Sequence, residues 1–265
     1  MIRVEGGNGV TAVVAPEHGA RIVSITAHGR EWLSPSRPDA SGPFVHAGTG
    51  GWDEAIPTVQ HCVLDGVVMP DHGDAWNAAW ELLPANGVTT AIDLRSLPIR
   101  LVRSITPTAT GLRLSYTAST ASASPVSFLW SAHPLFRAET GSFLRMTPQL
   151  LTEEHPVRGR TVTIPAGIDA IGADAALKAF ATGVAAASVV HADGAALTLS
   201  WDPHLLPYLG LYWDRGEFTT APVMAIEPTM APTDSAARAA SLWSVTATSP
   251  KTWWLDVTAA KNERA

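Results

Sequence analysis

The sequence has few of the features that mark membrane, secreted and zinc-binding proteins. Cys62 is the only cysteine among 265 residues, which excludes an intramolecular disulfide and any zinc site built on several cysteines. No run reaches the roughly 18 consecutive apolar residues of a membrane-spanning helix. The opening residues "MIRVEGGNGV" contain no apolar segment of a secretion signal. These absences predict a cytoplasmic protein.

Charge is also scarce, and no basic cluster stands out. Charged residues make up 16% of the chain and the net charge is −6. A nucleic-acid binder needs a basic patch, and an acidic protein offers nothing to an anionic membrane surface. No glycine-rich phosphate loop follows a predicted strand. We therefore expect neither a nucleic acid nor a membrane as partner.

Short runs of β-type residues, separated by Gly, Pro, Asn, Asp and Ser, make up most of the chain. Residues Leu101–Thr108 and Leu112–Ser119 flank a glycine-containing turn, as in a hairpin. Helical signals are few: the alanine-rich Ala173–Ala181 runs into Gly183, and Ser235–Ala240 is long enough for a turn or two. Further strands are expected at Thr11–Ala15, Arg21–Ala27, Thr89–Leu94, Val126–Ala132, Ala185–His191, Ala196–Trp201, Leu209–Trp213, Val223–Glu227, Ser241–Thr248 and Trp253–Val257.

More than ten strands at this spacing predict a large antiparallel sandwich or barrel. Hydrophobic residues amount to 46%, enough for a sizeable core. No linker and no internal repeat interrupts the pattern. We therefore predict a single all-β domain over residues 1–265, as a monomer or a homodimer.

Four segments do not fit the pattern of short strands and turns. Two of them place a titratable side chain at the end of an apolar run and directly before a proline, namely His133 before Pro134 and Glu227 before Pro228. Proline has no N–H to donate, so each ladder is expected to end there and each side chain to lie at a rim. Burial of Glu227 would raise its pKa and make it a better base. The segments are "GGWDEAIPTV" (Gly50–Val59), "MPDHGDAW" (Met69–Trp76), "SAHPLF" (Ser131–Phe136) and "IEPTMAPTDS" (Ile226–Ser235).

Each of these residues also has a purely structural reading. A histidine such as His133 is often satisfied by a backbone group, and Glu227 could pair with an arginine. As a set, however, His72, His133 and Glu227 suit acid–base chemistry on a sugar, whose C–H face stacks on aromatic rings. The tryptophans that could supply such a ring, or belong to the core instead, are Trp52, Trp76, Trp130 and Trp213.

Taken in order, "PDHGDAW", "AHPLF" and "IEPTMAPTD" resemble the aldose 1-epimerase (galactose mutarotase-like) family, as does "LPYLGLYWDRGEF" (Leu206–Phe218). The resemblance implies a β-supersandwich of two large, mostly antiparallel sheets with an open cleft. It also implies a monosaccharide or sugar derivative as ligand, with no metal and no organic cofactor. In such enzymes a glutamate takes the proton from the anomeric hydroxyl and a histidine protonates the ring oxygen. Carried over, Glu227 is the base, His133 the acid, and His72 a sugar-binding residue.

Two departures from the family pattern affect the sugar contacts. The family carries an Asn-Arg pair upstream of the first histidine, whereas this chain has Asp53 and Glu54 in that region, and no aspartate matches the one expected between His133 and Glu227. We expect Asp53 and Glu54 to face the cleft and to favour neutral or cationic sugars over acidic ones. The full set of expected substrate-binding residues is His72, Asp53, Glu54, Trp52, Trp76 and Asp214.

Other functions remain open at this point. A glycoside hydrolase or lyase on the same fold would pair Glu227 with a second carboxylate, from Asp53, Glu54 or Asp214. A non-catalytic sugar-binding domain is a third reading. A metal site built from His61, Asp71 and His72 is a further alternative.

Overall fold

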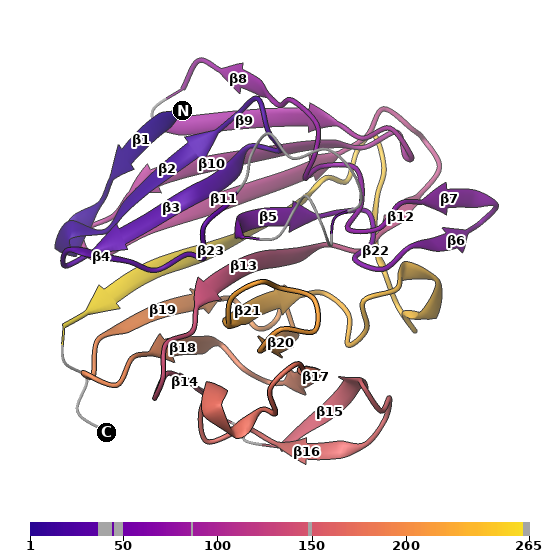
Figure 1. Ribbon diagram of the computed structural model, residues 1–265. Helices are drawn as coiled ribbons and strands as arrows, with labels where there is room; N and C mark the ends of the chain where they lie inside the picture. Colours follow the sequence, from indigo (N-terminus) through magenta and orange to yellow (C-terminus); the bar gives the residue numbers. More distant parts are fainter. Residues whose placement is uncertain (37–43, 45–49, 86, 148–149, 262–265) are drawn as a thin grey trace.

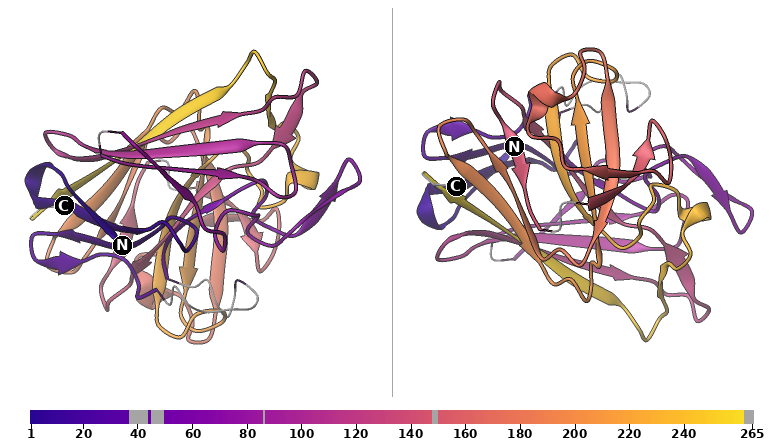
Figure 2. Two further views of the ribbon diagram at one scale, coloured as in Figure 1. Left: turned by 90° about the horizontal axis from the view of Figure 1, so that it is seen from above. Right: turned by 90° about the horizontal axis from the view of Figure 1, so that it is seen from below.

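The computed structural model describes residues 1–36, 44, 50–85, 87–147 and 150–261 (Figure 1). Within these residues, two large sheets of almost entirely antiparallel strands form the molecule. Figure 2 shows them from two further sides, stacked as two layers. The predicted all-β sandwich of two large antiparallel sheets is therefore confirmed.

The larger sheet has eleven strands in the described part of the chain, and β4 (Arg30–Glu31) pairs with β3 off its main path. All the residues of the site described below that lie on strands come from this sheet. Its spatial order is β1 (Ile2–Glu5), β2 (Thr11–Ala15), β3 (Arg21–Ala27), β5 (Gly51–Ala55), β13 (Ser131–Arg137), β21 (Val223–Thr229), β20 (Tyr208–Asp214), β17 (Ala176–Thr182), β15 (Leu150–His155) and β16 (Thr161–Thr163).

The second sheet has eight strands in the same described residues, and it covers one face of the first. Its central strands alternate buried and partly exposed residues along their length, as expected of a sheet with one face on the core. Its order is β14 (Phe143–Arg145), β18 (Ala186–Val190), β19 (Ala196–Trp201), β23 (Lys251–Ala260), β11 (Gly111–Ser119), β10 (Arg100–Pro107), β9 (Val88–Asp93) and β8 (Glu81–Leu83).

Two small two-stranded sheets and three short 3-10 turns complete the elements with described bounds. The pair β6–β7 projects from the side of the sandwich (Figure 1). The segment Ser235–Ala240 does contain a short turn, but the alanine-rich Ala173–Ala181 supplies strand β17 and no helix. The elements are β6 (Cys62–Leu64), β7 (Val67–Met69), β12 (Val126–Phe128), β22 (Trp243–Val245), η1 (Gly7–Gly9), η2 (Ile168–Ala170) and η3 (Ala236–Arg238).

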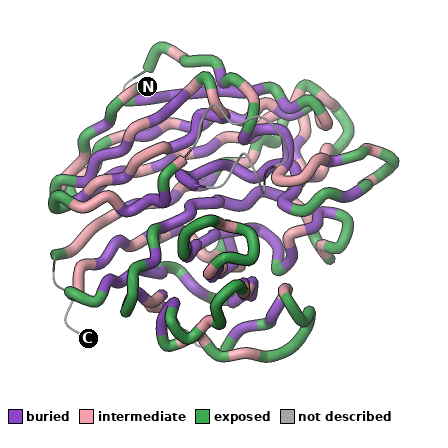
Figure 3. The backbone as a smooth tube through the Cα atoms, viewed as in Figure 1, coloured by how far each residue is buried: buried purple, intermediate pink, exposed green. Residues whose placement is uncertain are grey.

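The main core lies between the two sheets. Strand β21 is buried along its whole length, because one of its faces meets this core and the other lies at the floor of a cleft. Its residue Ile226 belongs to the same core cluster as Trp52 and Phe136. Figure 3 shows the buried strands in the middle of the molecule and the exposed turns around them.

The prediction that prolines end the strands carrying His133 and Glu227 is wrong. Strand β13 runs through Pro134 to Arg137, and β21 runs through Pro228 to Thr229. The expected single run Val126–Ala132 is instead divided between β12 and β13. Antiparallel neighbours on both sides hold these strands extended, and the extended backbone suits the fixed φ of proline.

Candidate active site

His133 and Glu227 lie directly opposite each other on adjacent central strands. The register of β13 and β21 pairs Ser131 with Thr229 and Leu135 with Ala225, so the residue midway between them on each strand is His133 and Glu227. Only the ends of this stretch are ladder partners, and the prolines Pro134 and Pro228 lie within the unpaired middle. The two side chains therefore project from the same face of the sheet at a break in its ladder.

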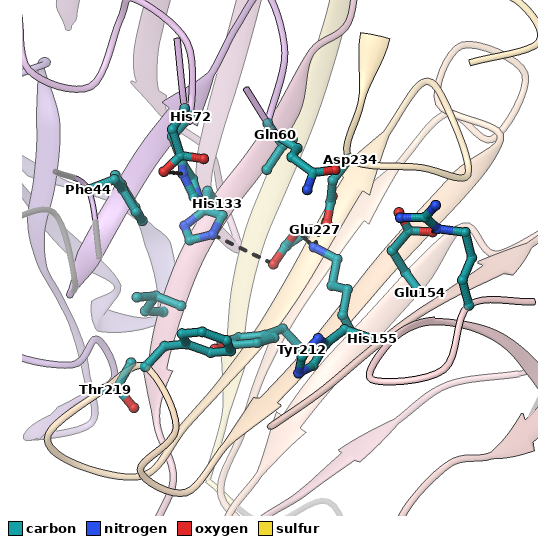
Figure 4. Close-up of a pocket in the computed structure, with 16 residues that line it drawn as sticks. Phe44, Gln60, His72, His133, Glu154, His155, Tyr212, Thr219, Glu227 and Asp234 are labelled. Carbon is teal, nitrogen blue, oxygen red and sulfur yellow. Dashed lines mark hydrogen bonds and ion pairs between the residues drawn. The ribbon is translucent and has the colours of Figure 1, made fainter. Parts of the chain in front are cut away.

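The two groups are close enough to share a ligand. Nε2 of His133 lies 3.9 Å from Oε1 of Glu227, and both side chains are almost fully buried. Figure 4 shows them converging on the cleft. Oε1 of Glu227 is buried without a hydrogen-bond partner among the described residues. A buried carboxylate oxygen left in this way is available to a ligand.

A lysine approaches Glu227 from the other side. Nζ of Lys178, on β17, donates to Oε2 of Glu227 and lies 3.3 Å from Oδ1 of Asp234. Strand β20 separates β17 from β21, and its residue beside Glu227 is Gly210. Because Gly210 has no side chain, the lysine reaches across β20 to the glutamate.

His72 comes to the site on a tight loop. Its backbone is left-handed, with φ 57°, and the next residue, Gly73, has φ 73°. A Cβ on Gly73 would meet the carbonyl oxygen of Ile56 at 1.9 Å, so only glycine fits there. The His72 ring stacks on Phe44 with centroids 3.5 Å apart and meets the His133 ring edge-on at 4.9 Å.

An aspartate lies beside the ring of His72. Oδ2 of Asp71 lies 3.1 Å from Nδ1 of His72. Burial alone would raise the pKa of Asp71, but the neighbouring imidazoles of His72 and His61 outweigh it and lower the pKa. Asp74 does not contribute, because its carboxylate accepts hydrogen bonds from the backbone and hydroxyl of Ser96.

These side chains line a cavity of about 320 Å³, within the range of roughly 300–1,000 Å³ usual for small-molecule sites. It combines acids, bases and aromatic rings. The lining residues are Phe44, Val59, Gln60, Asp71, His72, His133, Leu135, Glu154, His155, Arg158, Lys178, Tyr212, Phe218, Thr219, Glu227 and Asp234.

Burial moves the pKa values of the two central groups toward each other. Burial raises the pKa of Glu227, although the charge of Lys178 opposes the rise. Burial also lowers the pKa of His133 well below its ordinary value, and the charges of His72 and Lys178 lower it further. Burial disfavours the charged form of both groups, which makes the carboxylate a stronger base and the imidazolium a stronger acid.

The two tryptophans expected to bind sugar do not line the cavity. Trp52 is fully buried in the core between the sheets, as are Trp130 and Trp213. Trp76 is buried as well, and its ring meets the edge of Phe44 at 5.1 Å, behind the His72 loop. Successive side chains along a strand point to opposite faces of the sheet. Trp52 therefore points into the core, because its neighbour Asp53 lies on the other face of β5.

Asp53 and Glu54 were expected in the cleft, and the structure places neither on its wall. Asp53 is on the same face as His133, its register partner, but it is buried in an ion pair of 2.8 Å with Arg21. Glu54 points to the opposite face, where it accepts hydrogen bonds from Arg103, Tyr116 and Trp130. Burial raises its pKa to about 7, against the charge of Arg103. Both carboxylates are thus internal partners of arginines.

Asp214 also lies outside the cavity, although it supports part of its wall. Its carboxylate accepts from the backbone N–H groups of Gly216, Glu217 and Phe218 and from the hydroxyl of Tyr212. It therefore fixes the turn that carries Phe218 to the cavity. This role follows from its position at the end of β20.

Several lining residues were not anticipated from the sequence. Lys178 lies in the segment that looked helical, and Asp234 belongs to the quoted "APTD" segment without having been singled out. The aromatic lining comes from Phe44, Tyr212 and Phe218 rather than from tryptophan. The sequence did contain one signal for Lys178. It is the only charged residue in the apolar stretch "AALKAFA", which indicates a buried lysine.

Neither a metal cluster nor a membrane-spanning helix is found in the described part of the chain. No group of three or more His, Cys, Asp or Glu side chains there could hold a metal ion, which counts against the site considered from His61, Asp71 and His72. No helix among the same residues has the length and apolar character needed to cross a membrane.

Comparison with known proteins gives matches in structure alone. No family model and no curated protein matches the sequence. The galactose mutarotase-like protein from Lactobacillus casei superimposes with a TM-score of 0.76 at 19% identity, over 98% of this chain and 100% of that one. The Slr1438 protein from Synechocystis gives 0.77 at 16% identity, over 96% and 92%. The galactose mutarotase related enzyme from Lactobacillus acidophilus gives 0.73 at 15% identity, over 100% and 99%. The chain thus has the galactose mutarotase-like fold.

Proposed function

We propose that the protein is an aldose 1-epimerase, which interconverts the α and β anomers of a sugar. The observation that carries the proposal is the pairing of His133 and Glu227 across the ladder break, 3.9 Å apart, with a free carboxylate oxygen at the cavity. The shared fold with mutarotase-like proteins supports it.

The reaction needs one proton removed and one proton supplied in the same cavity. Glu227 takes the proton from the anomeric hydroxyl, a C1=O1 double bond forms, and the C1–O5 bond breaks as His133 protonates O5. Rotation about C1–C2 turns the other face of the aldehyde toward O5. The reverse proton transfers then close the ring as the opposite anomer, so no atom is gained or lost.

The charge state of the pair suits this exchange. The reaction requires a base and an acid in one cavity, and burial makes the Glu227 carboxylate a stronger base and the His133 imidazolium a stronger acid. His72 binds the sugar beside His133, and its ring stacks on Phe44. The aromatic side chains Phe44, Tyr212 and Phe218 offer surfaces for the C–H face of the ring.

The described lining favours neutral sugars, for a different reason from the one inferred from the sequence. Asp53 and Glu54 are internal, but four carboxylates line the cavity, against the two permanent cations Lys178 and Arg158. Both cations are already in ion pairs, with Glu227 and Asp234 and with Glu154. A sugar phosphate or uronic acid would meet a net negative wall.

The rival functions are less well supported. The hydrolase reading of the sequence paired Glu227 with Asp53, Glu54 or Asp214, and none of these three lines the cavity. A purely sugar-binding domain has no use for a buried acid–base pair with an unpartnered oxygen.

Exchange NMR on equilibrated anomers tests the proposal. The panel contains neutral hexoses and pentoses, the matching 6-phosphates and uronic acids, each with and without the protein. We expect faster exchange of at least one neutral aldose and slower turnover of its anionic derivative. Binding without faster exchange of any sugar would identify a binding domain, and release of sugar from a glycoside would identify a hydrolase. Preferred turnover of an anionic sugar would refute the inferred specificity.

A further inference from the structure

Lys178 is the cation most closely joined to the acid–base pair, and the mechanism above does not use it. Its side chain is only 7% exposed. Nζ contacts Oε2 of Glu227 and Oδ1 of Asp234, so one ammonium group joins two carboxylates at the cavity floor. Two ion-pair partners for a single buried lysine give the group a fixed position.

The contact with Lys178 gives the two carboxylate oxygens of Glu227 different surroundings. Oε2 is occupied by Lys178, whereas Oε1 is without a partner and faces Nε2 of His133. Without this anchor, the carboxylate could rotate about its last bond and exchange the two oxygens. A carboxylate that presents one chosen oxygen is preorganised for proton transfer.

We propose that Lys178 is a positioning residue that holds Oε2 of Glu227, so that Oε1 alone faces the sugar, and that Asp234 balances its charge. The proposal rests on the proposed function, since it assigns a role within that reaction. It goes beyond the acid, the base and the sugar contacts.

The charges around the pair allow the proposal to be tested by the pH dependence of the exchange rate. The charge of Lys178 lowers the pKa of both Glu227 and His133, whereas Asp234 raises that of Glu227. Removing Lys178 should therefore raise both pKa values, and removing the charge of Asp234 should lower that of Glu227. Other groups acting on the pair are His72 above the cleft, which affects both, and Arg21 on β3, which affects His133; Tyr212 on β20 is also close to Glu227.

The experiment compares Lys178→Met, Lys178→Arg and Asp234→Asn by their rates of anomer exchange against pH. For Lys178→Met we expect both limbs of the bell-shaped profile to move to higher pH by about 1 unit or more, with a maximal rate about 10-fold to 10²-fold lower. Asp234→Asn should move the acid limb to lower pH. Lys178→Arg should keep the profile near that of the wild type.

A merely structural lysine would give a different result. It would lower thermal stability and the rate, but would leave the shape and position of the profile unchanged, and that result would overturn the proposal. If Lys178→Met does not fold, as judged by circular dichroism, the acid shift of Asp234→Asn decides the matter, and an unshifted profile in that variant would overturn the proposal.

A second readout separates this proposal from the proposed function. The pKa of His133 is measured by NMR titration of its ring nitrogens in the free wild-type protein and in Lys178→Met. A higher value in the variant supports the electrostatic link even if no sugar is turned over, in which case the epimerase proposal alone fails. Exchange in the wild type, with an unchanged His133 pKa and pH profile in the variant, would reject the role of Lys178 alone.

Discussion

At the scale of single residues, His133 and Glu227 are expected to act as one unit. Glu227→Gln keeps the shape of the side chain and removes the base, and His133→Asn keeps a polar group that has no suitable pKa. Each should lower kcat for anomer exchange by about 10²–10⁴. The double variant should be little worse than the worse single one, because each half is ineffective alone.

The controls for this pair are matched substitutions on the exposed surface. Glu139→Gln and His204→Asn make the same chemical changes at exposed positions outside the cavity lining. Both should keep wild-type kinetics. Exchange at the wild-type rate in Glu227→Gln would show that the base is another residue.

Sequence reasoning grouped three side chains that the structure brings to one cavity, but it also placed there several side chains that do not line it. His72, His133 and Glu227 lie in motifs with unusual local composition, so they could be identified without a structure. The roles of Trp52 and Glu54 depend on which face of β5 meets the core, and a strand buried on both faces gives no alternation to read. Lys178 joins Glu227, 49 residues away in sequence, only because β17 and β21 lie on either side of β20.

At the scale of elements, Gly210 on β20 provides the space through which Lys178 reaches Glu227. A Cβ at this position would lie 3.3 Å from Oε2 of Glu227 and from the ring of Phe180. Gly210→Ala should therefore displace the carboxylate by a few tenths of an ångström and lower kcat by about 10-fold to 10²-fold. The rate of anomer exchange and the midpoint of unfolding should be measured together for this variant.

The matched control for this substitution is Gly172→Ala. An added Cβ there meets only the Cβ of Ala175, at an ordinary contact distance of 3.8 Å. Its activity should match the wild type. If Gly210→Ala also had wild-type activity, the position of the Glu227 carboxylate would not depend on the space left by Gly210.

At the scale of the whole molecule, Glu54 ties the two sheets together. It extends from β5 of the larger sheet to Arg103 on β10 and Tyr116 on β11 of the second sheet. Arg103→Met would leave a carboxylate buried without its cation, so we expect the free energy of unfolding to fall by roughly 3–5 kcal/mol. Denaturant unfolding measures this loss.

The double variant Arg103→Met with Glu54→Gln tests the cause. It removes the unpaired charge and should recover part of the lost stability. At temperatures where both variants are folded, anomer exchange should remain close to wild type, because neither residue lines the cavity. A loss below about 1 kcal/mol in Arg103→Met would mean that the pair contributes little to joining the sheets.

The sequence predicted the overall architecture better than its details. The expected strands Thr11–Ala15, Arg21–Ala27 and Ala196–Trp201 have the bounds observed in the structure. Short β-type runs and their turns are local properties, and local composition records them. The order of strands within each sheet depends on long-range pairing, which a single sequence does not specify.

The double ion pair of Lys178 has a further consequence for the chemistry of the open sugar. Ring opening would expose an aldehyde beside a primary amine, and a neutral amine adds to an aldehyde and loses water to form an imine. Burial would favour the neutral amine, but the charges of Asp234 and Glu227 raise the pKa of Lys178, so its nitrogen carries a proton and has no free electron pair. In the proposed reaction, the two carboxylates that fix the lysine would therefore also protect the open-chain sugar from covalent capture by the protein.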